Sequence, residues 1–66
     1  MTITINGQPR ELSKELPLTA LLKELGMNEK PVVVELNGTA ILQADYPATQ
    51  VQDRAKIEII TLAAGG

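Results

Sequence analysis

The sequence predicts an α+β fold in which a mixed sheet of four to five strands packs against one main helix. Two observations carry this prediction. The dipeptide Asn-Gly occurs at Asn6-Gly7 and again at Asn37-Gly38, each time between short runs rich in β-branched residues, as in a tight hairpin. A single stretch with helical spacing of leucines, residues 17–25, separates the two hairpins.

The first hairpin begins at residues 2–5, where polar and apolar β-branched side chains alternate as in a half-buried strand. Asn6-Gly7 supplies the positive φ angles of a two-residue turn. Residues 8–12 then return as the second strand. Pro9 has no N–H to donate, so we expect this strand at an edge of the sheet. Residues 13–16 form a polar connector.

Residues 17–25 predict a short helix. Pro17 suits the first turn, and Gly26 is placed to end the helix in a left-handed conformation. Its leucines recur at the i, i+3, i+4 and i+7 positions of one apolar stripe, which we expect to cover the sheet. They are Leu18, Leu21, Leu22 and Leu25.

The second hairpin begins at residues 32–36, whose nearly continuous apolar character predicts a strand inside the sheet. Residues 39–42 follow the turn as a short strand. Residues 43–53 predict an irregular segment. There we expect Tyr46 to pin a single turn to the body and Pro47 to stop it.

Residues 56–62 predict the closing strand. Placed beside the first strand and parallel to it, this strand fills the centre of the sheet, and a right-handed crossover joins the hairpins. That arrangement is a β-grasp. Ile57, Ile59 and Thr61 alternate onto the core face. The opposite face, which we expect to be a partner interface, carries Glu58, Ile60 and Leu62.

Length and composition restrict the chemistry of the chain. A chain of 66 residues is one domain, which we assign to residues 1–62, with residues 63–66 as a tail. It has no cysteine for thiolate chemistry and no histidine, the usual general base and commonest metal ligand. We therefore expect no catalytic residue, no metal site and no bound cofactor.

Charge and hydropathy restrict the partners. The net charge of −2 and the single aromatic residue, Tyr46, argue against binding nucleic acid. No apolar run approaches the roughly 18 residues of a membrane span, and no leader segment opens the chain. We expect a cytoplasmic protein that is monomeric when free.

The tail, residues 63–66, ends in Ala64-Gly65-Gly66. We expect the rest of the chain to hold out the carboxylate of Gly66. Side chains shrink to methyl groups and then to hydrogen, so the tail has little to bury and much conformational freedom to lose. We expect it to be flexible and to end naturally at the α-carboxylate of Gly66.

These features together resemble the ThiS family, the sulfur carrier proteins of thiamine biosynthesis, and more distantly the ubiquitin-like proteins. The resemblance covers the whole chain and depends on the order of its segments. Those segments are Ile3-Thr4-Ile5-Asn6-Gly7, Leu21-Leu22, Leu25-Gly26, Val32-Val33-Val34-Glu35-Leu36-Asn37-Gly38, Lys56-Ile57-Glu58-Ile59 and Ala64-Gly65-Gly66.

The chain departs from the family pattern at two places. The family commonly has Pro-Arg where this chain has Leu42-Gln43, which leaves the exact partner open. It commonly has Gly-Asp where this chain has Arg54-Ala55, so we expect a different turn before the closing strand.

The resemblance implies a protein cosubstrate. An E1-like adenylyltransferase of the ThiF type would use Mg-ATP to adenylate the Gly66 carboxylate. A persulfide enzyme would then convert it to a thiocarboxylate, and a thiazole synthase of the ThiG type would accept the sulfur. Three alternatives remain at this point: a sulfur carrier for molybdopterin, a ubiquitin-like protein modifier, and a β-grasp binding module with an inert tail.

Overall fold

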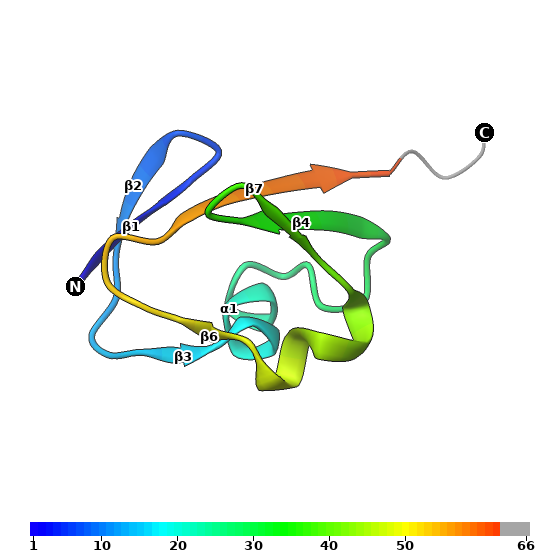
Figure 1. The fold of residues 1–66 in the computed structure, drawn as a ribbon, viewed down its shortest axis with the longest axis horizontal. Coiled ribbons are helices and arrows are strands. Elements are labelled where there is room, and N and C mark those ends of the chain that lie inside the picture. Colours follow the sequence, from blue (N-terminus) through cyan, green and yellow to red (C-terminus); the bar gives the residue numbers. More distant parts are fainter. Residues whose placement is uncertain (63–66) are drawn as a thin grey trace.

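The computed structural model describes residues 1–62 and confirms the α+β, β-grasp fold (Figure 1). The main strands are β1 (Thr2–Ile5), β2 (Gln8–Glu11), β4 (Val32–Leu36), β5 (Thr39–Ile41) and β7 (Lys56–Thr61). In the described part of the chain they form one mixed sheet of five strands in the order β2-β1-β7-β4-β5. Residues 63–66, and with them the predicted flexible tail, lie outside the described residues.

Both Asn-Gly dipeptides make the predicted turns. All four residues have positive φ angles, between 51° and 86°, as a type I′ hairpin requires. The first turn joins β1 to β2 and the second joins β4 to β5, both antiparallel. The strands β2 and β5 are consequently the two edges of the sheet, and Pro9 lies in an edge strand as predicted.

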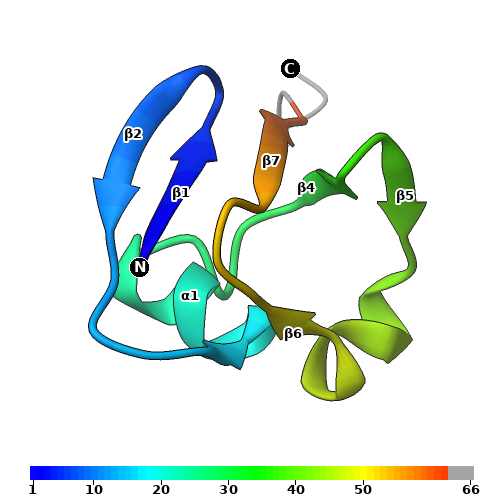
Figure 2. The same ribbon diagram turned by 60° about the vertical axis from the view of Figure 1, so that its left-hand side comes forward.

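The closing strand β7 occupies the centre of the sheet, as predicted. It runs parallel to β1 on one side and antiparallel to β4 on the other. Figure 2 shows β7 between the two hairpins, with the helix α1 (Leu18–Glu24) on one side of the sheet.

The core lies between the helix and the sheet. Leu18 and Leu21 have no exposed surface and Leu22 is 3% exposed, while Leu25 is only partly buried against them. From the sheet, Ile57 packs into the same cluster. Burying each such side chain contributes about 1.5–3 kcal/mol, so the leucine stripe supplies much of the stability of this small domain. The predicted helix ends are within one residue of the observed ones, and Gly26 has a φ of 72°.

Residues 43–53 are more regular than predicted. Gln43–Ala48 form a 3-10 helix, η1, and Pro47 lies inside it instead of stopping it. A short 3-10 helix depends on few hydrogen bonds, and Tyr46, only 7% exposed, anchors it to the core. The segment continues into β6 (Gln50–Val51), which pairs with β3 (Leu16–Pro17) in a second, two-stranded sheet.

Three predicted strands end one residue earlier in the structure than in the prediction. The residues left outside β2, β5 and β7 are Leu12, Leu42 and Leu62. Thr61 also differs from its prediction, because it is exposed at the end of β7, where the core no longer covers it.

Candidate functional site

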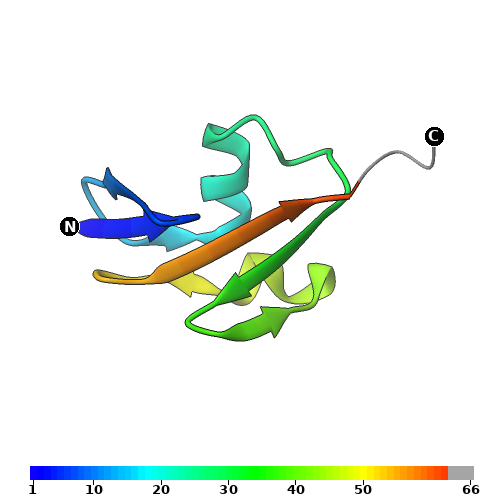
Figure 3. The ribbon, with the colours of Figure 1, turned by 90° about the horizontal axis from the view of Figure 1, so that it is seen from above.

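The strand that leads to residues 63–66 is paired with a neighbouring strand on each side. Five consecutive residues of β7 pair with β4, from Ile57 opposite Leu36 to Thr61 opposite Val32. Beyond the strand, the Leu62 N–H donates to the Pro31 carbonyl oxygen at 2.9 Å. The chain is therefore fixed by backbone hydrogen bonds up to the last described residue. Figure 3 shows β7 and β4 running side by side to this end of the molecule.

Asn6 extends the pairing of β7 with β1. The Asn6 N–H donates to the Ile57 carbonyl oxygen at 2.8 Å. Its side-chain amide then bonds both backbone groups of Ile59, as the backbone of a further β1 residue would. Nδ2 donates to the Ile59 carbonyl oxygen at 3.1 Å, and Oδ1 accepts from the Ile59 N–H at 2.7 Å. The left-handed turn that closes the first hairpin thus also holds the middle of β7.

Asn37 holds the start of the same strand from the other side. Its backbone N–H donates to the Lys56 carbonyl oxygen at 2.7 Å, and its Oδ1 accepts from the Lys56 N–H at 2.9 Å. The sequence predicted both asparagines as turn residues but did not predict their hydrogen bonds to β7. The presence of asparagine in both turns could have indicated such bonds, because its amide can pair with a backbone N–H and C=O.

A left-handed turn fixes the chain just before β7. The Ala55 N–H donates to the Gln52 carbonyl oxygen at 3.1 Å, and Arg54 has a φ of 68°. Arginine thus adopts the conformation that glycine favours. The turn is tied to β1 because the Thr2 N–H donates to Asp53 Oδ1 at 2.9 Å and the Arg54 N–H donates to the Thr2 carbonyl oxygen at 2.7 Å.

The predicted interface residues lie at and beyond the end of β7. Ile60 is 53% exposed and Glu58 is half-buried, and both alternate away from the buried Ile57 and Ile59, as predicted. Leu62 is 50% exposed but differs in its surroundings. It borders a small hollow of about 200 Å³ on the helix side, together with Leu22, Met27 and Tyr46. The sequence predicted that Glu58, Ile60 and Leu62 share one face of β7. In the structure Glu58 and Ile60 share that face, whereas Leu62 lies beyond the end of the strand, beside the hollow.

The neighbouring strand β4 adds two residues that the sequence did not assign to this face. Val33, 38% exposed, lies directly opposite Ile60 on β4. Glu35 lies directly opposite Glu58 in the same pair of strands. The sequence alone could not predict these neighbours, because they depend on the register in which β4 pairs with β7.

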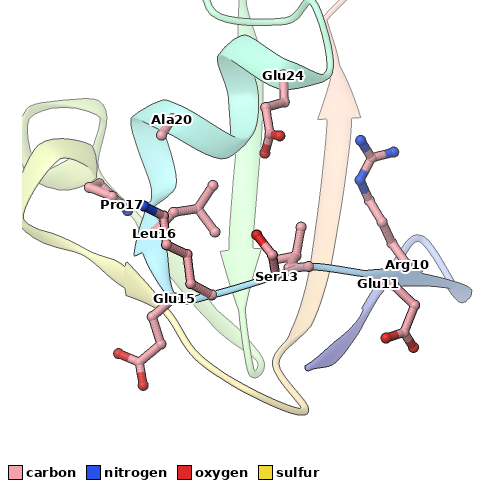
Figure 4. Close-up of a pocket in the computed structure, with 10 residues that line it drawn as sticks. Arg10, Glu11, Ser13, Glu15, Leu16, Pro17, Ala20 and Glu24 are labelled. Carbon is pink, nitrogen blue, oxygen red and sulfur yellow. The ribbon is translucent and has the colours of Figure 1, made fainter.

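A second, larger hollow is lined by residues that come early in the chain, between Arg10 and Glu24. It has a volume of about 600 Å³ and is formed by the connector after β2 and by α1. Figure 4 shows Glu24 of the helix and Ser13 of the connector pointing toward each other across it, whereas Glu11 and Glu15 point away. Every charged or polar residue that lines the hollow is exposed, so the hollow is an open surface feature.

Residues 1–62 contain no cluster of metal ligands and no membrane-spanning helix. Within this range, no three His, Cys, Asp or Glu side chains come together as metal ligands would. The described helices are also too short and too polar to span a membrane.

Comparison with known proteins gives consistent matches along the whole chain. The ThiS family profile matches residues 3–66. The sulfur carrier protein ThiS of Thermus thermophilus is 34% identical over 64 residues, covering 97% of this chain and 98% of that protein. A thiazole synthase of Paramagnetospirillum magneticum is 36% identical over 66 residues, all of this chain but only 20% of that protein. The crystal structure of the thiamine biosynthesis protein ThiS of Geobacter metallireducens superimposes with a TM-score of 0.87 at 33% identity, covering 100% of both chains.

Proposed function

The chain belongs to the ThiS family, and from this premise we propose that it carries sulfur for thiamine biosynthesis on the carboxylate of Gly66. The observation that carries the proposal is the extent of the family match. It runs from residue 3 to residue 66 and therefore includes the Gly65-Gly66 pair. The protein is a cosubstrate, and its partner enzymes supply the reactivity.

Gly66 changes in three chemical stages in this proposal. An E1-like enzyme of the ThiF type, using ATP and Mg²⁺, transfers AMP to the carboxylate and releases pyrophosphate. A persulfide sulfur of a donor enzyme then attacks the carbonyl carbon, and AMP leaves. A thiol finally attacks the sulfur of the donor enzyme and forms a disulfide with it, so that the original sulfur–sulfur bond breaks and a thiocarboxylate leaves on Gly66. Because the first stage consumes ATP, we place the protein in the cytoplasm.

The glycines of the tail suit passage into a narrow active site. Ala64, Gly65 and Gly66 can follow an extended path with little side-chain volume. A Cβ at either of the last two positions would crowd the channel wall and the tetrahedral centre that forms at the carbonyl carbon.

The folded body serves as the part that the enzymes recognise. We propose that Glu58, Ile60 and Leu62 contact the partner, since they are partly or largely exposed at the end of the chain that leads to the tail. Apolar side chains that stay exposed beside a functional group are typical of interfaces.

A thiazole synthase of the ThiG type is the proposed acceptor of the sulfur. In the Paramagnetospirillum magneticum protein of that name, a segment similar to this whole chain is part of the same polypeptide. Joining two proteins in one chain raises their effective concentration toward each other, which favours a pair that works together.

Reconstitution with the E1-like enzyme tests the proposal. The wild-type chain should support ATP–pyrophosphate exchange, and after addition of a persulfide donor its intact mass should show one oxygen replaced by sulfur. In the Gly66→Ala variant, exchange should fall by about 100-fold or more, because a misplaced reacting group costs that much. Its unfolding temperature should not change, because the residues of the core lie between Ile3 and Ile59 and keep their side chains. Equal exchange by both proteins would contradict the role of Gly66.

A further inference from the structure

The two Asn-Gly turns have nearly the same backbone but hold their asparagine side chains differently. Asn6 and Asn37 have φ angles of 51° and 52°, and the glycines that follow them have φ angles of 81° and 86°. A Cβ at Gly7 or Gly38 would meet no atom within 4 Å, so both turns are open to water. The turns lie on either side of β7 (Figure 2). A difference in chemical reactivity between them must therefore come from how each amide is bound.

Asparagine followed by glycine can modify itself in water. The backbone nitrogen of the glycine loses its proton and attacks the side-chain carbon Cγ of the asparagine. The bond from Cγ to Nδ2 then breaks, ammonia leaves, and a cyclic succinimide remains. Glycine favours this attack, because it has no Cβ to shield its nitrogen or to restrict the backbone. The reaction also needs an asparagine side chain that is free to swing its Cγ onto that nitrogen.

The Asn6 side chain is held back from this reaction by its bonds to β7. Its Nδ2 donates to the Ile59 carbonyl oxygen at 3.1 Å, and its Oδ1 accepts from the Ile59 N–H at 2.7 Å, both in a partly buried setting. Swinging Cγ toward Gly7 would break both bonds and leave the two Ile59 groups without partners, which is costly away from water. The amine that must leave is itself a donor in one of these bonds.

The Asn37 side chain is held by a single bond within residues 1–62. Its Oδ1 accepts from the Lys56 N–H at 2.9 Å, and this bond is exposed to water. Its Nδ2 donates to no group in that range, so the amine that must leave already lies in solvent. When Cγ swings toward Gly38, a water molecule can replace Oδ1 at the Lys56 N–H. The fold therefore resists the reaction much less at Asn37 than at Asn6.

We propose that Asn37 is a site of spontaneous deamidation in the folded protein, and that Asn6, in a turn of the same shape, is protected by its bonds to Ile59. Water opens the succinimide in either of two ways. Addition at the former side-chain carbonyl carbon gives an aspartate in a normal backbone. Addition at the main-chain carbonyl carbon gives an isoaspartate, whose backbone continues through the former side chain. Either way one water is consumed and one ammonia is released, with no oxidation or reduction.

The two products differ in their effect on β7. An aspartate in place of Asn37 keeps an oxygen that can accept from the Lys56 N–H. An isoaspartate adds a methylene group to the main chain of a two-residue turn, so it displaces this oxygen and disturbs the pairing of β4 with β5. Isoaspartate therefore loosens the start of the strand that leads to residues 63–66. The modification needs no partner enzyme and is independent of sulfur transfer.

Peptide mapping by mass spectrometry, after incubation of the whole chain in mildly alkaline buffer, measures deamidation at both sites. Methylation by an isoaspartyl methyltransferase counts the isoaspartate. Asn37 should react at least about fivefold faster than Asn6, as expected when a further, partly buried hydrogen bond must break at Asn6. In urea the two sites should react within about threefold of each other, because the unfolded chain lacks the bonds to β7. Asn37→Gln, whose longer side chain cyclises poorly, should remove most of the isoaspartate formed by the folded chain.

Two further variants test how each amide is bound. Asn37→Asp should leave the unfolding temperature within about 2 °C of wild type, since an acceptor for the Lys56 N–H remains. Asn6→Asp should lower it by about 5 °C or more, because a carboxylate then faces the Ile59 carbonyl oxygen in place of a donor. Equal rates at the two sites in the folded chain, faster reaction at Asn6, or reaction of Asn37 only in urea would overturn the proposal. An unchanged unfolding temperature for Asn6→Asp would also contradict it.

Discussion

Asn6 and Arg54 both have a left-handed backbone conformation, which residues other than glycine rarely adopt. Asn6 closes a hairpin with a left-handed backbone and also pairs its amide with the Ile59 N–H and C=O. Arg54 adopts a left-handed conformation, with a φ of 68°, in a place where glycine would be unstrained. Substitution by glycine separates the backbone contribution from that of the side chain in both cases.

For Asn6→Gly, we expect the free energy of unfolding to fall by about 1–3 kcal/mol. Glycine keeps the positive φ, but both hydrogen bonds to Ile59 are lost and the Ile59 groups remain partly buried. Asn37→Gly is the matched control, because it loses one side-chain bond to Lys56 and keeps the backbone bond. Urea unfolding measures both, and equal stability of Asn6→Gly and wild type would refute the amide's role.

For Arg54→Gly, the opposite result is expected. A left-handed conformation costs an L-residue about 1–2 kcal/mol, and substitution by glycine removes this cost. Glycine also loses more conformational entropy on folding, which offsets part of the stabilisation. Arg54 is exposed, so little packing is lost. The free energy of unfolding should rise by about 0.5–1 kcal/mol in urea unfolding. A decrease would show that the arginine side chain makes a stabilising contact.

At the scale of elements, β7 has two faces with separate tasks. Ile57 and Ile59 face the core, whereas Glu58 and Ile60 face away from it. The period-two pattern in the sequence was sufficient to predict this division, as the two Asn-Gly dipeptides were for the hairpins. Those signals are local, and each is repeated over several residues.

The elements that escaped prediction have no such repeated signal. The strands β3 and β6 are two residues each, too short for any periodicity, and they form because Leu16 pairs with the buried Val51. Pro47 within η1 was mistaken for a stop. The partners of Ile60 across the sheet also depend on long-range register, which single residues do not encode.

The two faces of β7 give a paired prediction. Ile57→Ala should lower the free energy of unfolding by about 2–5 kcal/mol, because Ile57 is fully buried and its truncation leaves a cavity. Ile60→Ala should change stability by less than about 1 kcal/mol, since Ile60 is 53% exposed, and should instead weaken binding to the E1-like enzyme. Thermal unfolding measures the stability of both variants, and a titration measures their binding to the E1-like enzyme. A large stability loss in Ile60→Ala would contradict the interface role.

At the scale of the whole molecule, the fold holds the strand that leads to residues 63–66 in the centre of the sheet. A helix and five strands build a small core around β7, and hydrogen bonds from both Asn-Gly turns and from Pro31 hold the chain as far as Leu62. Within residues 1–62, the titratable side chains are spread over the surface without a buried polar centre. We propose that the partner enzymes recognise the body and that the chemistry takes place at Gly66.

The most direct measurement of that claim is the intact mass of the protein isolated from cells that are making thiamine. We expect a fraction of the chains to end at Gly66 with one oxygen replaced by sulfur, and we expect none of this species after deletion of Gly65 and Gly66. Chains that carry only oxygen, or that are joined through Gly66 to lysines of other proteins, would contradict it.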